Sequence, residues 1–386
     1  MTADTPLLFQ PLTIRGVTMR NRIVVSPMCQ YASVEGGPSD WHLVHLGKFA
    51  MGGAGIVFGE ETSVEARGRK TYGCAGIYSD AHVPAYRRIN EFLKEQKAVP
   101  AIQLGHSGRK AGCRPPWEGF APLDEKDALA GRPGWPGLAP SPIPTSEKAM
   151  VPHEMDEADI AELLASWREA ALRSADAGFE ICEVHGAHGY LIQQFLSPIT
   201  NHRKDGYGGD RAGRMRLALE IVETVRAAWP DDKPLFFRVS AIDGQGGHWD
   251  LDDTVVLAKE LKERGVDVVD CSSGGISGPL TMSIVPRVPG YQVPFAEAVK
   301  KEAGILTQAV GLITEPQHAE AILQEGKADL IALARELLAD PNWPFRAAQE
   351  LGLENAFDLL PHSYSWWLRR REDIRAASRE AAGSAA

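Results

Sequence analysis

The sequence predicts an α/β fold, namely a closed (β/α)8 barrel with an N-terminal hairpin and a long loop after the third strand. Eight short apolar segments alternate with helical segments along the chain, an order typical of a parallel sheet covered by helices. The count of eight favours a barrel that closes on itself. An open doubly wound sheet is the alternative, but it needs a glycine-rich turn after the first strand, where residues 26–29 read Ser-Pro-Met-Cys.

The first half of the pattern begins with a hairpin. Residues 12–19 place β-formers on both sides of Gly16, and residues 22–26 form the first apolar run, so we expect a hairpin followed by a buried strand. The predicted strands and helices of this half are, in order, 22–26 and 41–51, 55–58 and 81–96, 99–104 and 157–177, and 179–184 followed by 189–196 and 211–229.

The second half repeats the alternation four times. Its predicted strands and helices are 235–239 and 251–264, 266–270 and 295–301, 305–310 and 316–324, and 328–332 with a helix resuming at 341. We therefore expect residues 1–368 to form a single barrel domain. Residues 369–386 are basic and then rich in Ala and Ser, which predicts a flexible C-terminal tail that is a fraying helix.

The longest irregular stretch covers residues 106–153 and is dense in Pro, Gly and Trp. It follows the third strand, so in a barrel it rises over the face where the parallel strands end. Loops of this length in a compact domain are usually lids or binding loops. A disordered insert is the alternative, but the aromatic residues of the stretch favour packing.

Composition excludes several classes of partner. The chain of 386 residues has 44% hydrophobic and 24% charged residues and a formal net charge of -10, which argues against a nucleic acid or an anionic membrane surface. It has no long apolar run and no basic start followed by an apolar run, so we expect a cytoplasmic protein. The five cysteines are odd in number and form no C-x-x-C motif, which is typical of a reducing compartment.

Polar residues gather where the predicted strands end, which is the face that carries the active site in such barrels. Gln103 and Arg238 lie in or near strand ends that are normally apolar, and a bound polar cofactor would satisfy them. Gly311 and Arg335 follow strands seven and eight, where barrels often hold a phosphate. The polar residues at this face are Cys29, Glu60, Glu61, Gln103, His106, His185, His188, Arg238 and Arg335.

Residues 179–198 place two imidazoles and a phenol where a strand gives way to a helix. His185, His188 and Tyr190 offer donors that can hold an oxygen and a group that can supply a proton. A helix cap, a surface pair or half of a zinc site are alternatives, but no H-E-x-x-H motif or clear third ligand is present. A nucleophilic Cys29 would need a depressed pKa, and a serine hydrolase would need a G-x-S-x-G motif, which the chain lacks.

Five motifs in order along the chain resemble the Old Yellow Enzyme family. The cysteine of the first motif is similar to that of the bacterial xenobiotic-reductase, or thermophilic-like, branch. The resemblance extends from residue 8 to about residue 368. The motifs are SPMCQY at residues 26–31, QLGHSGRK at 103–110, HGAHGYL at 185–191, RKDGYGG at 203–209 and AREL at 334–337.

The resemblance implies a barrel that binds FMN without a covalent bond and accepts electrons from NAD(P)H. It implies an ene-reductase for activated alkenes, namely enones, enals, maleimides and nitroalkenes. His185 and His188 would hold the activating oxygen, Tyr190 would donate a proton, and Tyr31 would close over the substrate. The residues implied to contact the flavin are Ser26, Pro27, Met28, Cys29, Glu61, Gln103, Arg238, Gly311, Ala334 and Arg335, with Cys29 tuning its potential.

Residues 360–369 resemble a segment that reaches into the active site of a neighbouring subunit in this branch, with Trp367 as the aligned aromatic residue. The resemblance therefore implies a homodimer or homotetramer with shared active sites. The alternative is that Trp366 and Trp367 pack on the base of their own barrel.

Some positions depart from the family pattern. Glu61 stands where a small residue usually meets the flavin, and a carboxylate there would disfavour an anionic flavin. Ala334 replaces a glycine, which is acceptable only if its φ is not positive. Asp210 and Gly213 depart from the pattern at a surface position. A flavin-binding protein without ene-reductase activity is the alternative function. A cofactor-free lyase or aldolase would need a Schiff-base lysine at a strand end, where the sequence predicts none.

Overall fold

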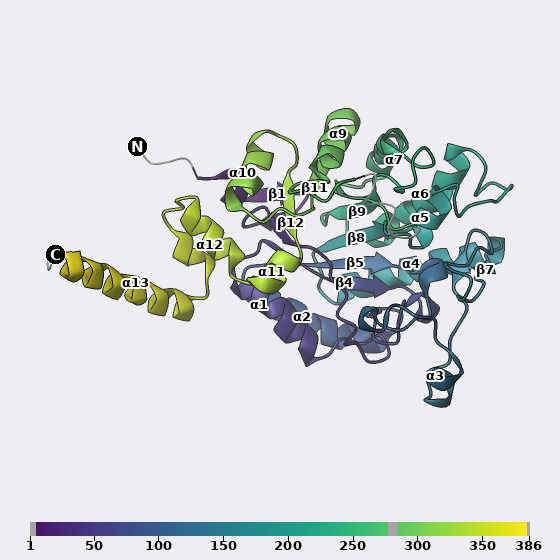
Figure 1. The fold of residues 1–386 in the computed structure, drawn as a ribbon, viewed down its shortest axis with the longest axis horizontal. Helices are drawn as coiled ribbons and strands as arrows, with labels where there is room; N and C mark the ends of the chain where they lie inside the picture. The colour runs from purple at the N-terminus through teal and green to yellow at the C-terminus, as the bar shows by residue number, and fades with distance from the viewer. Residues whose placement is uncertain (1–4, 277–284, 384–386) are drawn as a thin grey trace.

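A computed structural model describes residues 5–276 and 285–383. Eight parallel strands close into a barrel in the order β10-β11-β12-β3-β4-β5-β8-β9 (Figure 1). The predicted fold class is confirmed, and the open-sheet alternative is wrong. The strands are β3 (Ile23–Val25), β4 (Ile56–Ser63), β5 (Val99–Gly105), β8 (Ile181–Gly186), β9 (Leu235–Ser240), β10 (Val268–Ser272), β11 (Leu306–Ala309) and β12 (Leu330–Leu333).

The first and last strands of the barrel pair with each other. Ile23 of β3 lies opposite Ile331 of β12, and Val25 lies opposite Leu333. This pairing closes the barrel with residues that are about 300 positions apart in the chain, on the order of the domain's own length.

β4 departs most from the predicted boundaries. It was expected to cover residues 55–58, but it continues to Ser63. The register against β5 shifts between Phe58 and Glu61, and such an irregularity lets a strand continue through residues that do not fit the regular ladder. As a result Glu61 lies within the strand, opposite Gln103.

Helices cover the outside of the barrel (Figure 1). Several begin with an aspartate whose carboxylate accepts backbone N–H groups, as Asp156 and Asp250 do, which stabilises a helix start. Most lie within a few residues of the predicted boundaries. They are α1 (Asp40–Met51), α2 (Val83–Glu95), α4 (Glu157–Asp176), α5 (Leu191–Leu196), α6 (Arg211–Ala228), α7 (Leu251–Glu263), α9 (Val293–Ala303), α10 (Pro316–Gln324), α11 (Arg335–Ala339) and α12 (Trp343–Glu350).

The predicted hairpin is present and covers one end of the barrel. It consists of β1 (Leu12–Ile14) and β2 (Val17–Met19). Met19 packs in the same buried cluster as Phe58 and Phe236 from the barrel interior. Apolar contacts therefore fill the end of the barrel from which the strands start, and the polar site is left to the opposite end.

The long loop after β5 is folded against the body, so the structure does not support a disordered insert. It contains α3 (Glu125–Leu129) and two short parallel strands, β6 (Leu138–Ala139) and β7 (His153–Glu154). The Trp135 indole N–H donates to the Arg67 carbonyl at 2.8 Å, and the Tyr72 hydroxyl donates to the Pro133 carbonyl at 2.7 Å. We call residues 106–153 the lid.

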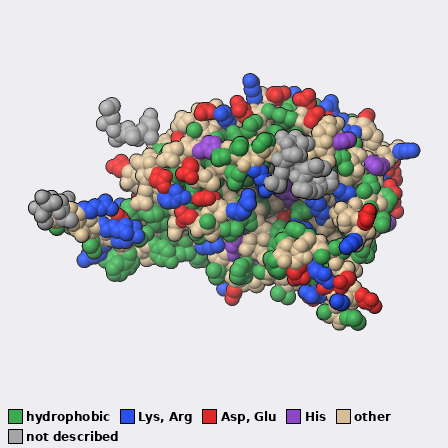
Figure 2. Space-filling view, viewed as in Figure 1, with side chains coloured by type: hydrophobic (Ala, Val, Ile, Leu, Met, Phe, Trp, Pro, Cys, Tyr) green, Lys and Arg blue, Asp and Glu red, His purple; other side chains and the backbone are tan. Residues whose placement is uncertain are grey.

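The C-terminal helix α13 (His362–Gly383) projects from the barrel (Figure 1). The expected boundary at residue 368 falls inside this helix. Trp366 and Trp367 are 50% and 66% exposed and pack edge to face with each other, so the alternative that they pack on the base of their own barrel is wrong. Figure 2 shows hydrophobic side chains gathered along the lower side of this region.

The helices among the described residues include none with both the length and the apolar character that a membrane crossing requires.

Candidate active site

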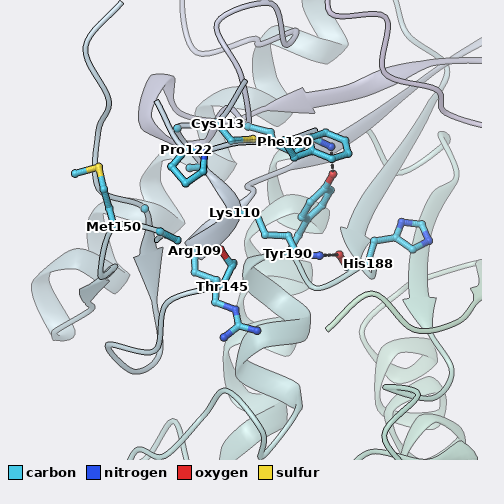
Figure 3. A pocket seen from close by; sticks show the side chains of 14 residues that line it. Arg109, Lys110, Cys113, Phe120, Pro122, Thr145, Met150, His188 and Tyr190 are labelled. Atoms are coloured by element: carbon cyan, nitrogen blue, oxygen red, sulfur yellow. Dashed lines mark hydrogen bonds between the residues drawn. The ribbon is translucent and has the colours of Figure 1, made fainter. Parts of the chain in front are cut away.

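A cavity of about 260 Å³ opens between the ends of the strands and the lid (Figure 3). Tyr190 and His188 lie on its barrel side, Pro122 and Met150 of the lid lie across from them, and Phe120 of the lid lies next to the hydroxyl end of Tyr190. The predicted catalytic turn and the predicted lid therefore share one pocket.

The residues of the catalytic turn lie together, as their spacing predicts. The His185 ring is 5.1 Å from the His188 ring and 5.0 Å from the Tyr190 ring, measured between centroids. β8 ends at Gly186, and α5 begins only after Tyr190, which is its N-cap. The helix starts two residues later than predicted because His188 and Gly189 both have positive φ, 59° and 70°.

Hydrogen bonds hold this turn in place. The His188 backbone N–H donates to the Ser240 hydroxyl at 3.0 Å, and its ring Nε2 lies 2.7 Å from the Ser272 hydroxyl. Lys110 Nζ donates to the carbonyls of His188 and Gly275 at 2.7 and 2.6 Å. A non-glycine residue with positive φ is strained, and it persists when its surroundings fix it in this way.

Burial keeps these groups in defined protonation states. It lowers the pKa of His185 and of His188 well below the usual value, and nearby cations add to the effect. Burial also raises the pKa of Tyr190. Both imidazoles are therefore neutral and the phenol keeps its proton at neutral pH, which suits two hydrogen-bond donors beside a proton donor.

Two lysines complete the site, and sequence reasoning assigned neither of them a role. Lys110 ends the second family motif, so its position offered a signal. Lys70 follows β4 by several residues and folds back so that its Nζ donates to the Tyr190 hydroxyl at 2.6 Å. The sequence predicts no lysine at a strand end, and Lys70 does not lie at one: the loop after β4 brings it to this face.

Polar groups line the centre of the barrel below the pocket. Arg238 Nη1 donates to the Ser26 hydroxyl at 3.1 Å, and Gln103 Nε2 donates to Glu183 at 2.8 Å. Arg238 Nε is 3.2 Å from an Asp270 oxygen but is not aligned for a hydrogen bond. Burial raises the pKa of Asp270, and it raises that of Glu183 to about 8 with a contribution from Asp270.

These groups fit a planar cofactor with a polar edge. Arg238 Nε and His185 Nδ1 are buried and lack hydrogen-bond partners among the described residues, and buried polar groups normally have partners. Ser26 lies beside Arg238, and Gln103 lies on β5, where it is bonded to Glu183 of β8, the strand between β5 and β9. The pyrimidine edge of a flavin carries the acceptors and donors that such a set can bind.

The predicted phosphate residues lie at the ends of the adjacent strands β11 and β12. Gly311 has φ of 121°, which favours glycine. Ala334 has φ of -118°, so alanine is accommodated there without left-handed strain. Arg335 is exposed and begins α11. The corner therefore offers a cation and backbone N–H groups of the kind that bind phosphate.

Glu61 is turned toward the neighbouring strand. Its carboxyl group occupies the space that a β-carbon at Gly105 would need. Both carboxyl oxygens are buried and lack hydrogen-bond partners among the described residues. Burial raises the pKa of Glu61 to about 7, Lys70 opposes this shift and Glu60 adds to it. Glu61 is therefore partly neutral at pH 7.

The first family motif lies directly after β3. Pro27 and Met28 follow Ser26 there, before Cys29 and Tyr31. Burial raises the pKa of Cys29 well above the usual value, so the alternative of a nucleophilic thiolate is not supported. Tyr31 packs edge to face on Trp117 of the lid, with ring centroids 5.5 Å apart, and its φ is 57°.

Of the predicted site residues, only Trp367 lies away from this region in its own chain. It is on α13, which projects from the barrel (Figure 1).

Comparison with known proteins identifies relatives over most of the chain. Residues 7–354 match the model of the NADH:flavin oxidoreductase / NADH oxidase family. An NADPH dehydrogenase of Geobacillus sp. (strain WCH70) is 46% identical over 348 residues, which cover 90% of this chain and 95% of the relative. An NADPH dehydrogenase of Bacillus subtilis (strain 168) is 42% identical over 349 residues, covering 90% and 96%.

Solved structures support the same fold. Morphinone reductase superposes with a TM-score of 0.73 at 23% identity, covering 91% of each chain. The old yellow enzyme homologue from Zymomonas mobilis superposes with a TM-score of 0.74 at 24% identity, covering 89% of this chain and 93% of the other.

Proposed function

Because the chain belongs to the NADH:flavin oxidoreductase / NADH oxidase family, the Old Yellow Enzyme family, we propose that it is an ene-reductase that reduces alkenes conjugated to a carbonyl or nitro group. The family fixes the coarser statement: the protein is an NAD(P)H-dependent flavin oxidoreductase that uses FMN. The observation that carries the proposal is the cluster of His185, His188 and Tyr190, of which His188 and Tyr190 line the pocket.

The two histidines suit the binding of an oxygen on which negative charge develops. Bound FMN supplies a hydride to the β-carbon of the alkene. Negative charge then grows on the activating oxygen, and a preorganised donor at such an oxygen is worth about 3 kcal/mol. Because His185 and His188 are neutral and held by the turn, we assign them this position.

Tyr190 suits the delivery of the proton. Its pKa is raised by burial, so its hydroxyl carries a proton at neutral pH. Its ring lies against His185, which supports a position of the hydroxyl near a substrate whose oxygen the histidines would hold. We assign Tyr190 as the general acid toward the α-carbon. Tyr31, which packs on the lid, would cover the bound substrate, and Cys29 would lie beside the flavin and tune its potential.

The cofactor assignment follows the fit described above. Gln103, Arg238 and Ser26 would bind the polar edge of the flavin, and Gly311, Ala334 and Arg335 would bind its phosphate. Pro27, Met28 and Glu61 would contact the ring.

The His185→Ala/His188→Ala double variant tests the proposal. We expect it to lose turnover of cyclohex-2-en-1-one by a factor of at least about 10², while anaerobic bleaching of the flavin by NADPH or NADH stays near the wild-type rate. Stopped-flow absorbance follows the two half-reactions separately. An equal loss in both half-reactions would contradict the assigned role.

A flavin-binding protein without ene-reductase activity is the second candidate. The observation in its favour is the buried carboxyl group of Glu61 near the flavin site. Holoenzyme that bleaches with NADPH but reduces none of a panel of enones, enals, maleimides and nitroalkenes would support it.

We also propose a homodimer or homotetramer with shared active sites. Trp367 and its neighbour Trp366 are exposed on the projecting helix α13, whereas Arg369 is bound within its own chain by an ion pair of 2.7 Å to Asp358. Light scattering of wild type and of Trp367→Ala would test this. A monomeric wild type would contradict the proposal, and a monomeric variant of a dimeric wild type would support it.

A further inference from the structure

Lys70 is a buried cation beside the proton donor. Its residue exposure is 8%. Its Nζ donates to the Tyr190 hydroxyl at 2.6 Å and lies 4.9 Å from the ring centroid of Phe120 and 5.6 Å from that of Tyr31. Aromatic faces favour a cation at these distances, so the ammonium group is held in one place at the wall of the pocket.

The Lys70 ammonium group has no carboxylate in direct contact among the described residues. Among the described residues, the ion pairs within 4.0 Å include none to Lys70. Glu61 is near enough to interact electrostatically, but its own pKa of about 7 leaves it partly neutral. Burial opposes the charge on Lys70, yet its pKa is raised, and the hydrogen bond to the Tyr190 hydroxyl contributes to this shift.

The other cations of the pocket are already bound to the backbone. Lys110 donates to two carbonyls, as described above. Arg109 donates to the carbonyls of Ile143 and Ile276 at 3.2 and 2.7 Å. The described lining residues include no Asp or Glu, although the chain as a whole carries a net charge of -10. The described lining of the pocket is therefore electropositive. The Lys70 ammonium faces it with phenols as its hydrogen-bond partners among the described residues, Tyr190 at 2.6 Å and Tyr31 beside it.

A buried ammonium whose hydrogen-bond partners are phenols has no counter-charge in contact with it. An ammonium group has three donors, and leaving a charge unpaired in a buried site is costly unless a counter-ion completes it. An anion that enters the cavity would supply both the charge and the acceptors.

We propose that the pocket selects activated alkenes that carry a carboxylate on the substituent of the α-carbon, and that Lys70 binds this carboxylate. The inference rests on the proposed function, because it takes the pocket as the substrate site. Since Tyr190 is assigned to the α-carbon, the Lys70 ammonium 2.6 Å from its hydroxyl lies beside the substituents of that carbon. Lys70 thus determines specificity, while His185 and His188 bind the activating oxygen.

A matched pair of ligands tests the inference: 2-(carboxymethyl)cyclohex-2-en-1-one and its methyl ester. The two differ in charge but share the reacting alkene. Titration into the oxidised holoenzyme, followed by the visible spectrum of the flavin, gives dissociation constants without turnover. We expect the acid to bind wild type about tenfold or more tightly than the ester, and kcat/KM to follow the same order.

Three variants isolate the charge. Lys70→Met should remove the preference for the acid, and Lys70→Arg should retain most of it. Lys126→Met on the exposed surface of the lid helix α3 is the control and should leave the preference unchanged. Equal binding of acid and ester by wild type would overturn the inference, even if Lys70→Met failed to fold.

The remaining outcomes separate this inference from the proposed function. If Lys70→Met weakens turnover of acid and ester equally and leaves their binding ratio unchanged, Lys70 only positions Tyr190 and the inference is overturned. If neither compound is turned over but the acid still binds more tightly in a Lys70-dependent way, the ene-reductase proposal fails and the anion site stands.

Discussion

The same strands form both ends of the barrel interior, but one end is filled by apolar side chains and the other by polar and charged side chains. At the end closed by the hairpin, Phe58 and Phe236 pack with Met19 in an apolar cluster. Further along β9, Arg238 lies 3.2 Å from the Asp270 carboxyl group and interacts electrostatically with Glu183. Residues 236 and 238 are both almost fully buried, so burial does not distinguish them. The apolar end stabilises the fold, and the polar end holds buried groups that a partner must satisfy.

The largest expected effect is at the apolar end. Phe236→Ala removes a side chain of 0% exposure whose ring centroid is 6.1 Å from that of Phe58. We expect the free energy of unfolding to fall by about 3–5 kcal/mol, with the kcat of the folded fraction nearly unchanged. Chemical denaturation and steady-state assays measure the two quantities. A loss of kcat without a loss of stability would contradict the assignment of stability to the apolar end and of activity to the polar end.

The polar end should show the reverse pattern. Tyr190→Phe removes the hydroxyl that accepts from Lys70 and should lower enone turnover by about 10²-fold, with a loss of stability smaller than that of Phe236→Ala. Anaerobic bleaching by NADPH serves as the internal control and should persist. Undiminished turnover would show that another group donates the proton.

A smaller effect is expected from the pH dependence of Glu61. Its pKa is raised from 4.5 to about 7 in the folded state, so the folded protein binds the proton more tightly than the unfolded chain. Its contribution to stability is therefore fully present below about pH 4.5 and falls as pH rises to about 7. Because a shift of one pKa unit corresponds to about 1.36 kcal/mol, the free energy of unfolding falls by up to about 3 kcal/mol over this range.

Glu61→Gln tests that contribution. The variant should gain melting temperature relative to wild type as pH rises from 5 to 8, as differential scanning calorimetry of the holoenzymes would measure. A constant difference between the two proteins across this range would show that Glu61 is already ionised in the folded state. Glu61 would then differ in protonation state from Glu183 and Asp270, whose pKa values burial raises.

Most of the fold could be predicted from the sequence, because each strand and helix has a local pattern. Helix α10 begins and ends at the predicted residues, Pro316 and Gln324. The continuation of β4 to Ser63 was missed, since it depends on a register shift against β5 rather than on the residues of β4.

The candidate site likewise contains residues that local sequence predicts and residues that only long-range contacts bring together. His185, His188 and Tyr190 lie within six residues of one another, so their proximity could be predicted. Lys70 was missed because long-range contacts place it. The Ser107 backbone N–H donates to the Gly68 carbonyl, and that of Cys113 donates to the Lys70 carbonyl, both at 2.8 Å. No local pattern encodes such contacts between the loop after β4 and the lid. The roles assigned to the site residues stay predictions until the variants above are measured.

The pairing of β3 with β12 sets a minimum time for the folding of this protein in the cell. Ile23 leaves the ribosome long before Ile331, its neighbour in the closed barrel. At about 5–20 residues per second, synthesis of the intervening chain takes roughly 15–60 s. Throughout that interval one edge of β3 lacks its final partner, and unpaired strand edges promote aggregation. The edge of β3 therefore stays open to wrong pairing until the last barrel strand emerges.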